Sequence, residues 1–278
     1  MPDALEITRR AKSNLAFALS ILPREKRRDM VVFYAFCRTM DDLTDSPGIA
    51  MGERGSGLDA WQAGLVSGFE HASTLQEQVV GMRDRCGIPN HLLMEIIDGC
   101  RMDLQARHFE TWEDLSGYIW KVACAVGLVS IRLFGCVDPG SERYAVALGR
   151  ALQMINILRD IREDFDNGGR IYLPLEDFAR FGYTQDDLAR RVRDDRFLAL
   201  MAFEAGRAEG FFREAAEALP VVDRRALAPA RIMGEIYQKL LDRMVRDDFR
   251  VFDRRYRVCR FRKLAIFTRH LAASLYFR

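Results

Sequence analysis

The sequence has 278 residues, of which 49% are hydrophobic and 29% charged, with 8 prolines, 20 glycines and 6 cysteines. This composition supplies enough apolar material for a large folded core, and it excludes a disordered chain, a collagen-like repeat and a disulfide-stapled miniprotein. The 42 Lys and Arg residues nearly balance the 40 Asp and Glu residues, so the overall charge does not indicate a nucleic-acid partner. The cysteines and the four histidines neither cluster nor show C-x-x-C spacing, which argues against a zinc site.

The first residues do not resemble a secretory signal, because no basic segment precedes an apolar one. No uninterrupted apolar run reaches the roughly 20 residues that a membrane-spanning helix needs. We therefore expect the protein in the cytoplasm.

Apolar residues recur at intervals of three and four along almost the whole chain, which is typical of packed helices. The windows with this pattern are 4–20, 29–44, 57–70, 74–86, 90–107, 111–134, 140–164, 184–191, 194–218, 222–253 and 260–277. No segment alternates polar and apolar residues between turn signals, so we expect no substantial sheet. Breaks with proline or glycine separate the windows, and none opens a long polar linker. The sequence predicts one all-α domain over residues 1–278, with a mobile loop at its most glycine-rich stretch, 46–57.

The first polar cluster directly follows a very apolar part of the second window. At about 100° per residue, four of its side chains fall within an arc of roughly 60° on one helix face. They are Tyr34, Arg38, Asp41 and Asp45, and Asp42 lies at the edge of the arc. Two or three carboxylates thus lie beside a guanidinium and a phenol. The alternative interpretation is a solvated charged face with a weak Arg–Asp pair.

The second polar cluster lies in the window 140–164. Four polar side chains share an arc of roughly 80°, while apolar residues occupy the other sides of the helix. They are Gln153, Asn156, Asp160 and Asp164. A polar stripe on an otherwise apolar helix must be either hydrogen-bonded in the core or solvated in a cavity.

Aspartates four residues apart on one helix face repel each other unless positive charge lies between them. This arrangement occurs twice in the chain, and a divalent cation would relieve the repulsion at both places. Oxygen ligands suit Mg²⁺, which binds through one or two carboxylates together with substrate phosphates. If the two helices face each other across a cavity, they form a site for a diphosphate held by metal ions.

With both clusters described, the chain resembles the squalene/phytoene synthase family of head-to-head prenyltransferases over nearly its whole length. The motifs that carry the resemblance are Leu22-Pro23, Tyr34-x-x-x-Arg38-x-x-Asp41-Asp42-x-x-Asp45, Tyr118-x-x-x-Val122-Ala123-x-x-Val126-Gly127, Gln153-x-x-Asn156-Ile157-Leu158-Arg159-Asp160-x-x-x-Asp164 and Arg170-Ile171-Tyr172-Leu173-Pro174. The resemblance implies an all-α isoprenoid-synthase bundle in which two prenyl diphosphates meet in a central cavity.

The resemblance also implies roles for single residues. The Mg²⁺ ligands would be Asp41, Asp45, Asn156, Asp160 and Asp164. The diphosphates would be held by Tyr34, Arg38, Gln153, Arg159, Tyr237 and Arg254, of which Arg38 and Arg159 also stabilise charge on the leaving group. Tyr118 would lie near the reacting carbons. Ser13 and Asn14 occupy the place of a serine-containing segment found in many members, and they are candidates for a further phosphate contact.

The length and the segment 256–264 look most like the bacterial presqualene diphosphate synthases of squalene and hopanoid pathways. This implies 1'-1 condensation of two farnesyl diphosphates to presqualene diphosphate with Mg²⁺. NADPH is not expected, since no G-x-G-x-x-G follows a strand. The alternatives are a complete squalene synthase, a phytoene synthase that uses geranylgeranyl diphosphate, a class I terpene cyclase and a non-enzymatic helical scaffold. The R-I-Y-L-P segment argues against the cyclase.

The end of the chain is strongly basic. Residues 254–278 contain eight Lys and Arg residues and no acidic residue, whereas the rest of the chain is acidic overall. Apolar residues interleave with these cations: Phe261, Leu264, Ile266, Phe267, Leu271, Leu275, Tyr276 and Phe277. The pattern suggests a helix that could lie on an anionic membrane surface. The alternative is that its apolar side closes the bundle while Arg254 reaches the diphosphates.

Overall fold

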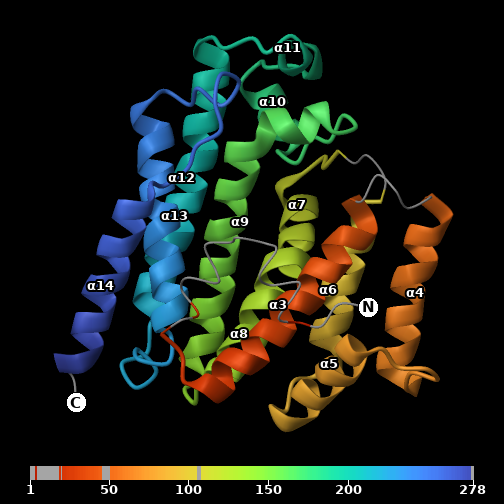
Figure 1. The fold of residues 1–278 in the computed structure, drawn as a ribbon. Coiled ribbons are helices and arrows are strands. Elements are labelled where there is room, and N and C mark those ends of the chain that lie inside the picture. The colour runs from red at the N-terminus through yellow and green to blue at the C-terminus, as the bar shows by residue number, and fades with distance from the viewer. Residues whose placement is uncertain (1–3, 5–18, 20, 46–50, 105–107, 277–278) are drawn as a thin grey trace.

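The computed structural model describes residues 4, 19, 21–45, 51–104 and 108–276, which form a bundle of helices (Figure 1). The helices are α3 (Arg24–Asp45), α4 (Met51–Ser67), α5 (Thr74–Arg85), α6 (Asn90–Met102), α7 (Trp112–Ile119), the π-helical turn η1 (Trp120–Cys124), α8 (Ala125–Phe134), α9 (Gly140–Asp166), α10 (Leu175–Arg180), α11 (Gln185–Ala189), α12 (Asp195–Ala218), α13 (Ala228–Arg246) and α14 (Arg260–Tyr276). The described residues contain no β-strand, and one isolated bridge pairs His108 with Ile171. The predicted all-α fold is confirmed.

Helix α9 runs through the middle of the bundle, with α12, α13 and α14 on one side and α3 to α8 on the other (Figure 1). Side chains of its first half, such as Tyr144 and Leu148, belong to a core shared with α3 to α6 and α8. Those of its second half, such as Ile155 and Leu158, belong to a core shared with α7, α12 and α13. Residues far apart in the sequence therefore reach the space along α9.

Side chains at the N-termini fix where several helices begin. Ser73, Thr111 and Thr184 each accept a hydrogen bond from the backbone three residues on and complete capping boxes for α5, α7 and α11. Asp194 accepts from the backbone N–H groups of Arg196 and Phe197 at the start of α12. Because these caps satisfy N–H groups that a helix leaves unpaired, these four helices begin within one residue of the predicted starts.

The glycine-rich stretch 46–57 differs from its prediction as a loop, because α4 already begins at Met51. Residues 46–50 lie outside the described residues. A Cβ atom at Gly57 would lie 3.0 Å from Cδ2 of Leu43, so glycine there lets α4 approach α3 closely. Gly57 therefore permits close helix packing where composition alone predicts a loop.

The window 222–253 contains a shorter helix than its periodicity predicts. Helix α13 begins at Ala228 with a proline in its first turn, where the missing N–H costs no hydrogen bond. It ends at Arg246, and Asp248 and Phe249 then adopt positive φ angles of 48° and 51°. Such left-handed residues cannot continue a helix, so the chain turns toward α14.

The helical rod Trp112–Phe134 is long and apolar enough, by length and composition, to cross a membrane, with a mean hydropathy of 1.4. A search for uninterrupted apolar runs does not find it, because Lys121 and Arg132 divide the segment. In the bundle the rod packs against α6 and α9. A helix packed among other helices can be as apolar as a membrane-spanning helix, so the composition of the rod is explained by its place in the bundle.

Two glycines set the distance between this rod and α9. A Cβ atom at Gly127 would lie 2.9 Å from the carbonyl oxygen of Ala145, and one at Gly149 would lie 3.0 Å from that of Ala123. Both distances are shorter than ordinary carbon–oxygen contact, so any larger residue would push the helices apart. The two segments form one wall of the cavity described next.

Candidate active site

A largely apolar cavity of about 440 Å³ lies among α3, α6, η1, α8, α9 and α13. Its wall includes the apolar side chains of Phe33, Ile96, Val126, Ile131, Leu148 and Met233. Its polar lining residues are Tyr34, Asp41, Asp103, Tyr118, Ser130, Tyr144, Gln153, Asn156 and Tyr237. All of these except Asp103, Ser130 and Tyr144 are predicted from the sequence as site residues, so the fold brings six of the predicted residues to one cavity.

The α3 part of the site is open to solvent. Asp41 lines the cavity, and the thiol of Cys100 lies 3.9 Å from its carboxylate. Arg38 forms an ion pair of 2.6 Å with Asp42, and both side chains are about half exposed. Arg38 is therefore next to the cavity and outside its lining. The side chain of Asp45 lies outside the described residues, as do Ser13 and Asn14.

The α9 part of the site begins with two amides that face the cavity. Nδ2 of Asn156 donates a hydrogen bond of 3.3 Å to Oε1 of Gln153. Oδ1 of Asn156 is buried, and none of the described residues donates a hydrogen bond to it. A buried acceptor without a partner is costly, whereas an oxygen ligand directed at a cation is satisfied by that cation.

Asp160 is surrounded by guanidinium groups. Nε of Arg159 donates a hydrogen bond of 2.8 Å to Asp160, and a second contact joins the Arg159 Nη2 and the same carboxylate. Arg255 approaches this carboxylate within 3.3 Å and also forms an ion pair of 2.8 Å with Glu163. Burial disfavours the Arg159 cation, but its bonds to Asp160 raise the pKa of Arg159 above the usual value.

Asp164 lies one turn further along α9 in a less favourable setting. Burial raises the pKa of Asp164 to about 7, and the neighbouring carboxylate of Asp160 adds to this shift, while Arg170 opposes it. A carboxyl group with such a pKa binds a proton near neutral pH unless another cation takes its place. The donor set of Asn156, Asp160 and Asp164 thus fits a divalent cation in its chemistry.

Among the described residues, no three acidic, histidine or cysteine side chains are gathered closely enough to hold a metal by themselves. Mg²⁺ does not require such a cluster, because it keeps waters and takes further oxygens from a bound phosphate. The residues that would hold such an ion are Asp41 on α3 and Asn156, Asp160 and Asp164 on α9.

Tyr118 is hydrogen-bonded to an acid that the sequence analysis did not select. Its hydroxyl group donates to Oδ2 of Asp103 over 3.0 Å, and the hydroxyl group of Tyr172 donates to Oδ1 over 2.8 Å. Arg170 donates to the backbone carbonyl of Asp103 over 3.0 Å. Burial, and after it the Asp103 carboxylate, raises the pKa of Tyr118 well above the usual value. Tyr118 is therefore a neutral phenol of fixed orientation.

A sequence signal for Asp103 does exist. It follows Ile96 and Cys100 at helical intervals of four and three, so it extends the buried face of α6. A single carboxylate on an apolar helix face is unusual, because burying it requires hydrogen-bond partners. The partners here are tyrosines from two other segments, which the periodicity of α6 cannot reveal.

The predicted pair Tyr237 and Arg254 is divided between two places. Tyr237 lines the cavity, but Arg254 forms an ion pair with Asp247 and lies over the ring of Tyr256. Arg255 is the residue that reaches the α9 carboxylates. Successive side chains of a non-helical segment point to different sides, so adjacent arginines have different partners.

Three comparisons with known proteins agree with this geometry. Residues 8–262 match the family model described as squalene/phytoene synthase. The chain is 35% identical to a 15-cis-phytoene synthase from Synechocystis over 91% of this chain and 80% of that protein. It is 33% identical to a phytoene synthase from Mycobacterium tuberculosis over 97% of this chain and 89% of that protein.

Solved structures give the same result. A dehydrosqualene synthase in complex with a ligand superposes with a TM-score of 0.85 at 27% identity, over 97% of this chain and 94% of that chain. The squalene synthase HpnC from Alicyclobacillus acidocaldarius superposes with a TM-score of 0.79 at 28% identity, over 88% of this chain and 93% of that chain.

Proposed function

Since the chain belongs to the squalene/phytoene synthase family, whose members are prenyltransferases, we propose that it joins two farnesyl diphosphates by 1'-1 condensation and releases presqualene diphosphate. The observation that carries this proposal is the cavity, where polar side chains of α3 and α9 border an apolar space. A diphosphate suits the polar border, and a prenyl chain suits the apolar wall.

Mg²⁺ bound by Asp41, Asn156, Asp160 and Asp164 would neutralise negative charge on a diphosphate leaving group. The arginines of both helices serve the same purpose from the protein side. Arg38 and Arg159 now pair with carboxylates and would exchange these partners for diphosphate oxygens, to which guanidinium groups bind in a bidentate manner. The expected roles of Tyr34, Gln153 and Tyr237 are to orient the diphosphates at the cavity.

The apolar wall would exclude water from the allylic cation that remains after ionisation. It would also hold the double bond of the second substrate close to that cation, which is catalysis by positioning. Tyr118 would contribute as a neutral phenol, because its raised pKa keeps the hydroxyl group protonated at neutral pH and leaves no phenolate to act as a base. The released diphosphate would be the base for the proton that is lost when the cyclopropane ring closes.

A second candidate function has specific support. Relatives that are 35% and 33% identical are named phytoene synthases, which favours geranylgeranyl diphosphate as substrate and a forty-carbon product. The two functions use the same polar residues and differ in the length of prenyl chain that the apolar wall accommodates. A direct test of substrate length therefore separates them.

The experiment is incubation of the purified protein with farnesyl or geranylgeranyl diphosphate and Mg²⁺, with and without NADPH, followed by analysis of the lipids. We expect presqualene diphosphate from farnesyl diphosphate, unchanged by NADPH. Squalene formed on adding NADPH would indicate a complete squalene synthase, and a forty-carbon product would indicate a phytoene synthase. A cyclic hydrocarbon from one substrate, or no turnover and no stabilisation by Mg²⁺ with a diphosphate analogue, would contradict the proposal.

A further inference from the structure

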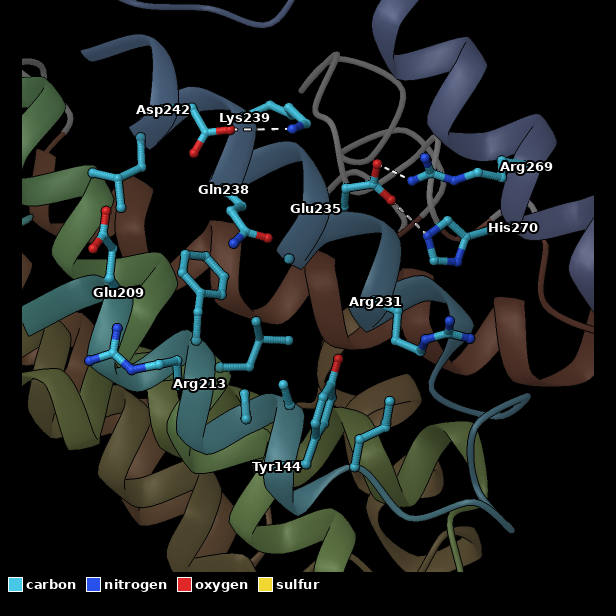
Figure 2. Close-up of a pocket in the computed structure, with 17 residues that line it drawn as sticks. Tyr144, Glu209, Arg213, Arg231, Glu235, Gln238, Lys239, Asp242, Arg269 and His270 are labelled. Atoms are coloured by element: carbon cyan, nitrogen blue, oxygen red, sulfur yellow. Dashed lines mark hydrogen bonds and ion pairs between the residues drawn. The ribbon is translucent and has the colours of Figure 1, made fainter. Parts of the chain in front are cut away.

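Helix α14 is the outermost helix of the bundle and is fastened to α13 through one side (Figure 1). Ile266 packs against Ile232 and Ile236 of α13. Figure 2 shows a hollow between α12 and α13 at whose edge Glu235 of α13 binds both Arg269 and His270 of α14. Burial would raise the pKa of Glu235, but these two partners hold it below its usual value, so the ion pair with Arg269 is maintained near neutral pH. Burial lowers the pKa of His270, so its contact with Glu235 is a hydrogen bond at that pH. The orientation of α14 is thereby fixed.

The opposite side of α14 carries exposed apolar residues. Phe261 is 85% exposed, Leu264 50% and Leu271 39%. On a helical projection these three side chains point away from Ile266, and Arg260 lies at one margin of their stripe. A stripe of exposed apolar side chains with flanking cations is typical of a helix that lies at a lipid interface.

A strongly basic hollow of about 490 Å³ adjoins the start of this helix. Its cationic lining residues are Lys239, Arg243, Arg246, Arg254, Arg257 and Arg262. Asp247 is the acid among the lining residues, and it is already paired with Arg254. Burial lowers the pKa of the adjacent Lys263, and the positive charges of Arg260 and Arg257 lower it further. Lys239 also pairs with Asp242, and the six cations still outnumber the two acids that pair with them, so the region holds an excess of positive charge.

Helix α13 lies between this surface and the cavity. Met233 and Tyr237 line the cavity on one side and pack against the Ile266 cluster on the other. One helix thus separates the apolar space from α14. A protein that docks through α14 would have its cavity close to the surface on which it rests.

We propose that α14 and the adjoining hollow form a docking surface for an anionic phospholipid bilayer. The cations would attract anionic headgroups, and Phe261 and Leu264 would enter the interface between headgroups and acyl chains. The excess of positive charge selects an anionic partner, and the exposed apolar stripe selects one with an accessible apolar layer. This proposal can be tested independently of the condensation reaction, because binding to vesicles is measured without turnover.

The test is co-sedimentation of the full chain with phosphatidylcholine vesicles that contain or lack phosphatidylglycerol. We expect binding to the anionic vesicles only, and weaker binding as salt rises toward ~0.15 M, where charges are screened beyond roughly 8 Å. The triple variant Arg257→Ala, Arg260→Ala, Arg262→Ala should bind at least about tenfold more weakly, since each cation near an anionic surface strengthens binding about fivefold. Phe261→Ser with Leu264→Ser should weaken binding at all salt concentrations.

Matched controls remove the same chemistry elsewhere on the surface. Arg190→Ala, Arg224→Ala, Arg225→Ala removes three exposed cations, and Val221→Ser with Val222→Ser removes two exposed apolar side chains. Equal losses in the controls and the α14 variants would overturn the proposal, as would equal binding to neutral vesicles. Binding to duplex DNA as strong as to vesicles would assign the surface to nucleic acid instead. A dimer that Phe261→Ser with Leu264→Ser dissociates would assign it to a second copy of the chain.

Discussion

The carboxylates of α3 and of α9 have different surroundings: Asp41 of α3 lines the cavity, whereas Asp160 and Asp164 of α9 lie beyond its lining residues. On α9, Asp160 is 15% exposed and is bound by Arg159 and Arg255. On α3, the pair of Arg38 and Asp42 is about half exposed. An exposed pair contributes at most about 1 kcal/mol to stability, whereas loss of one partner from a buried pair costs about 1–3 kcal/mol or more.

This difference indicates which acids contribute to the stability of the fold as well as to cation binding. Asp160 balances arginines that come from its own helix and from the chain end, so it helps hold residue 255 against α9. Asp41 lies on an exposed part of α3, where solvent screens the charge of its carboxylate. Substitutions should therefore cost more stability on α9 than on α3, while activity should fall on both helices.

Asp160→Asn should have the largest effect. We expect turnover to fall by about a thousandfold or more, which corresponds to roughly 4 kcal/mol of lost transition-state stabilisation. The melting temperature should also fall, because Arg159 and Arg255 lose the charge that they bind. Asp166→Asn is the control on the same helix, since Asp166 forms an exposed pair with Arg191. Full activity of Asp160→Asn, or full activity of the unmodified protein in EDTA, would contradict the metal site.

Asp41→Asn should reduce turnover on the order of a hundredfold through loss of one cation ligand. Its melting temperature should fall less than that of Asp160→Asn, because the Asp41 carboxylate is more exposed than that of Asp160. The neighbouring Asp42→Asn is the control, because it removes only the exposed pair with Arg38 and should leave turnover nearly unchanged. If Asp41→Asn and Asp42→Asn behaved alike, the division of roles along α3 would be wrong.

Asp103→Asn extends the comparison to an acid that belongs to neither helix. We expect a loss of turnover of about tenfold, because one of the two tyrosine hydroxyl groups loses a charged acceptor and the phenol of Tyr118 becomes free to reorient. The pKa of Tyr118 should fall in this variant, since the Asp103 carboxylate raises it second only to burial. Ultraviolet titration against Tyr118→Phe measures this shift. An unchanged pKa would show that the Asp103 carboxylate does not act on Tyr118.

The smallest effect concerns Glu204 of α12, a fully buried acid outside both clusters. Burial raises its pKa to about 8 from 4.5, although Arg207 pairs with it at 2.7 Å. Between these pH values the folded protein binds more protons than the unfolded chain, so the free energy of unfolding falls as pH rises through this range. Glu204→Gln should remove this decline in melting temperature between pH 5 and pH 8. Glu209→Gln, at an exposed position of the same helix, should keep it.

Much of the fold and site follows from local sequence patterns. The helical projections of α3 and α9 correctly place Tyr34, Asp41, Gln153 and Asn156 at one cavity, because neighbours on a helix face are set by the residue spacing. Asp103 and Arg255 escape this reasoning, since their partners come from other segments of the chain. The sequence does not predict the start of α4 for a related reason. Whether glycine at position 57 favours a helix or a loop depends on how closely Leu43 of another helix approaches it.

The glycine contacts between the α7–α8 rod and α9 have a consequence for how substrate preference can change. Backbone atoms of Ala123 and Ala145 already lie where the Cβ atoms of larger residues would be, so these two helices cannot move closer together. The depth of the cavity then depends on which side chains fill it, such as Phe33 and Leu148. A single exchange of one large side chain for a small one would lengthen the space for a prenyl chain without moving the helices or the acids that they carry.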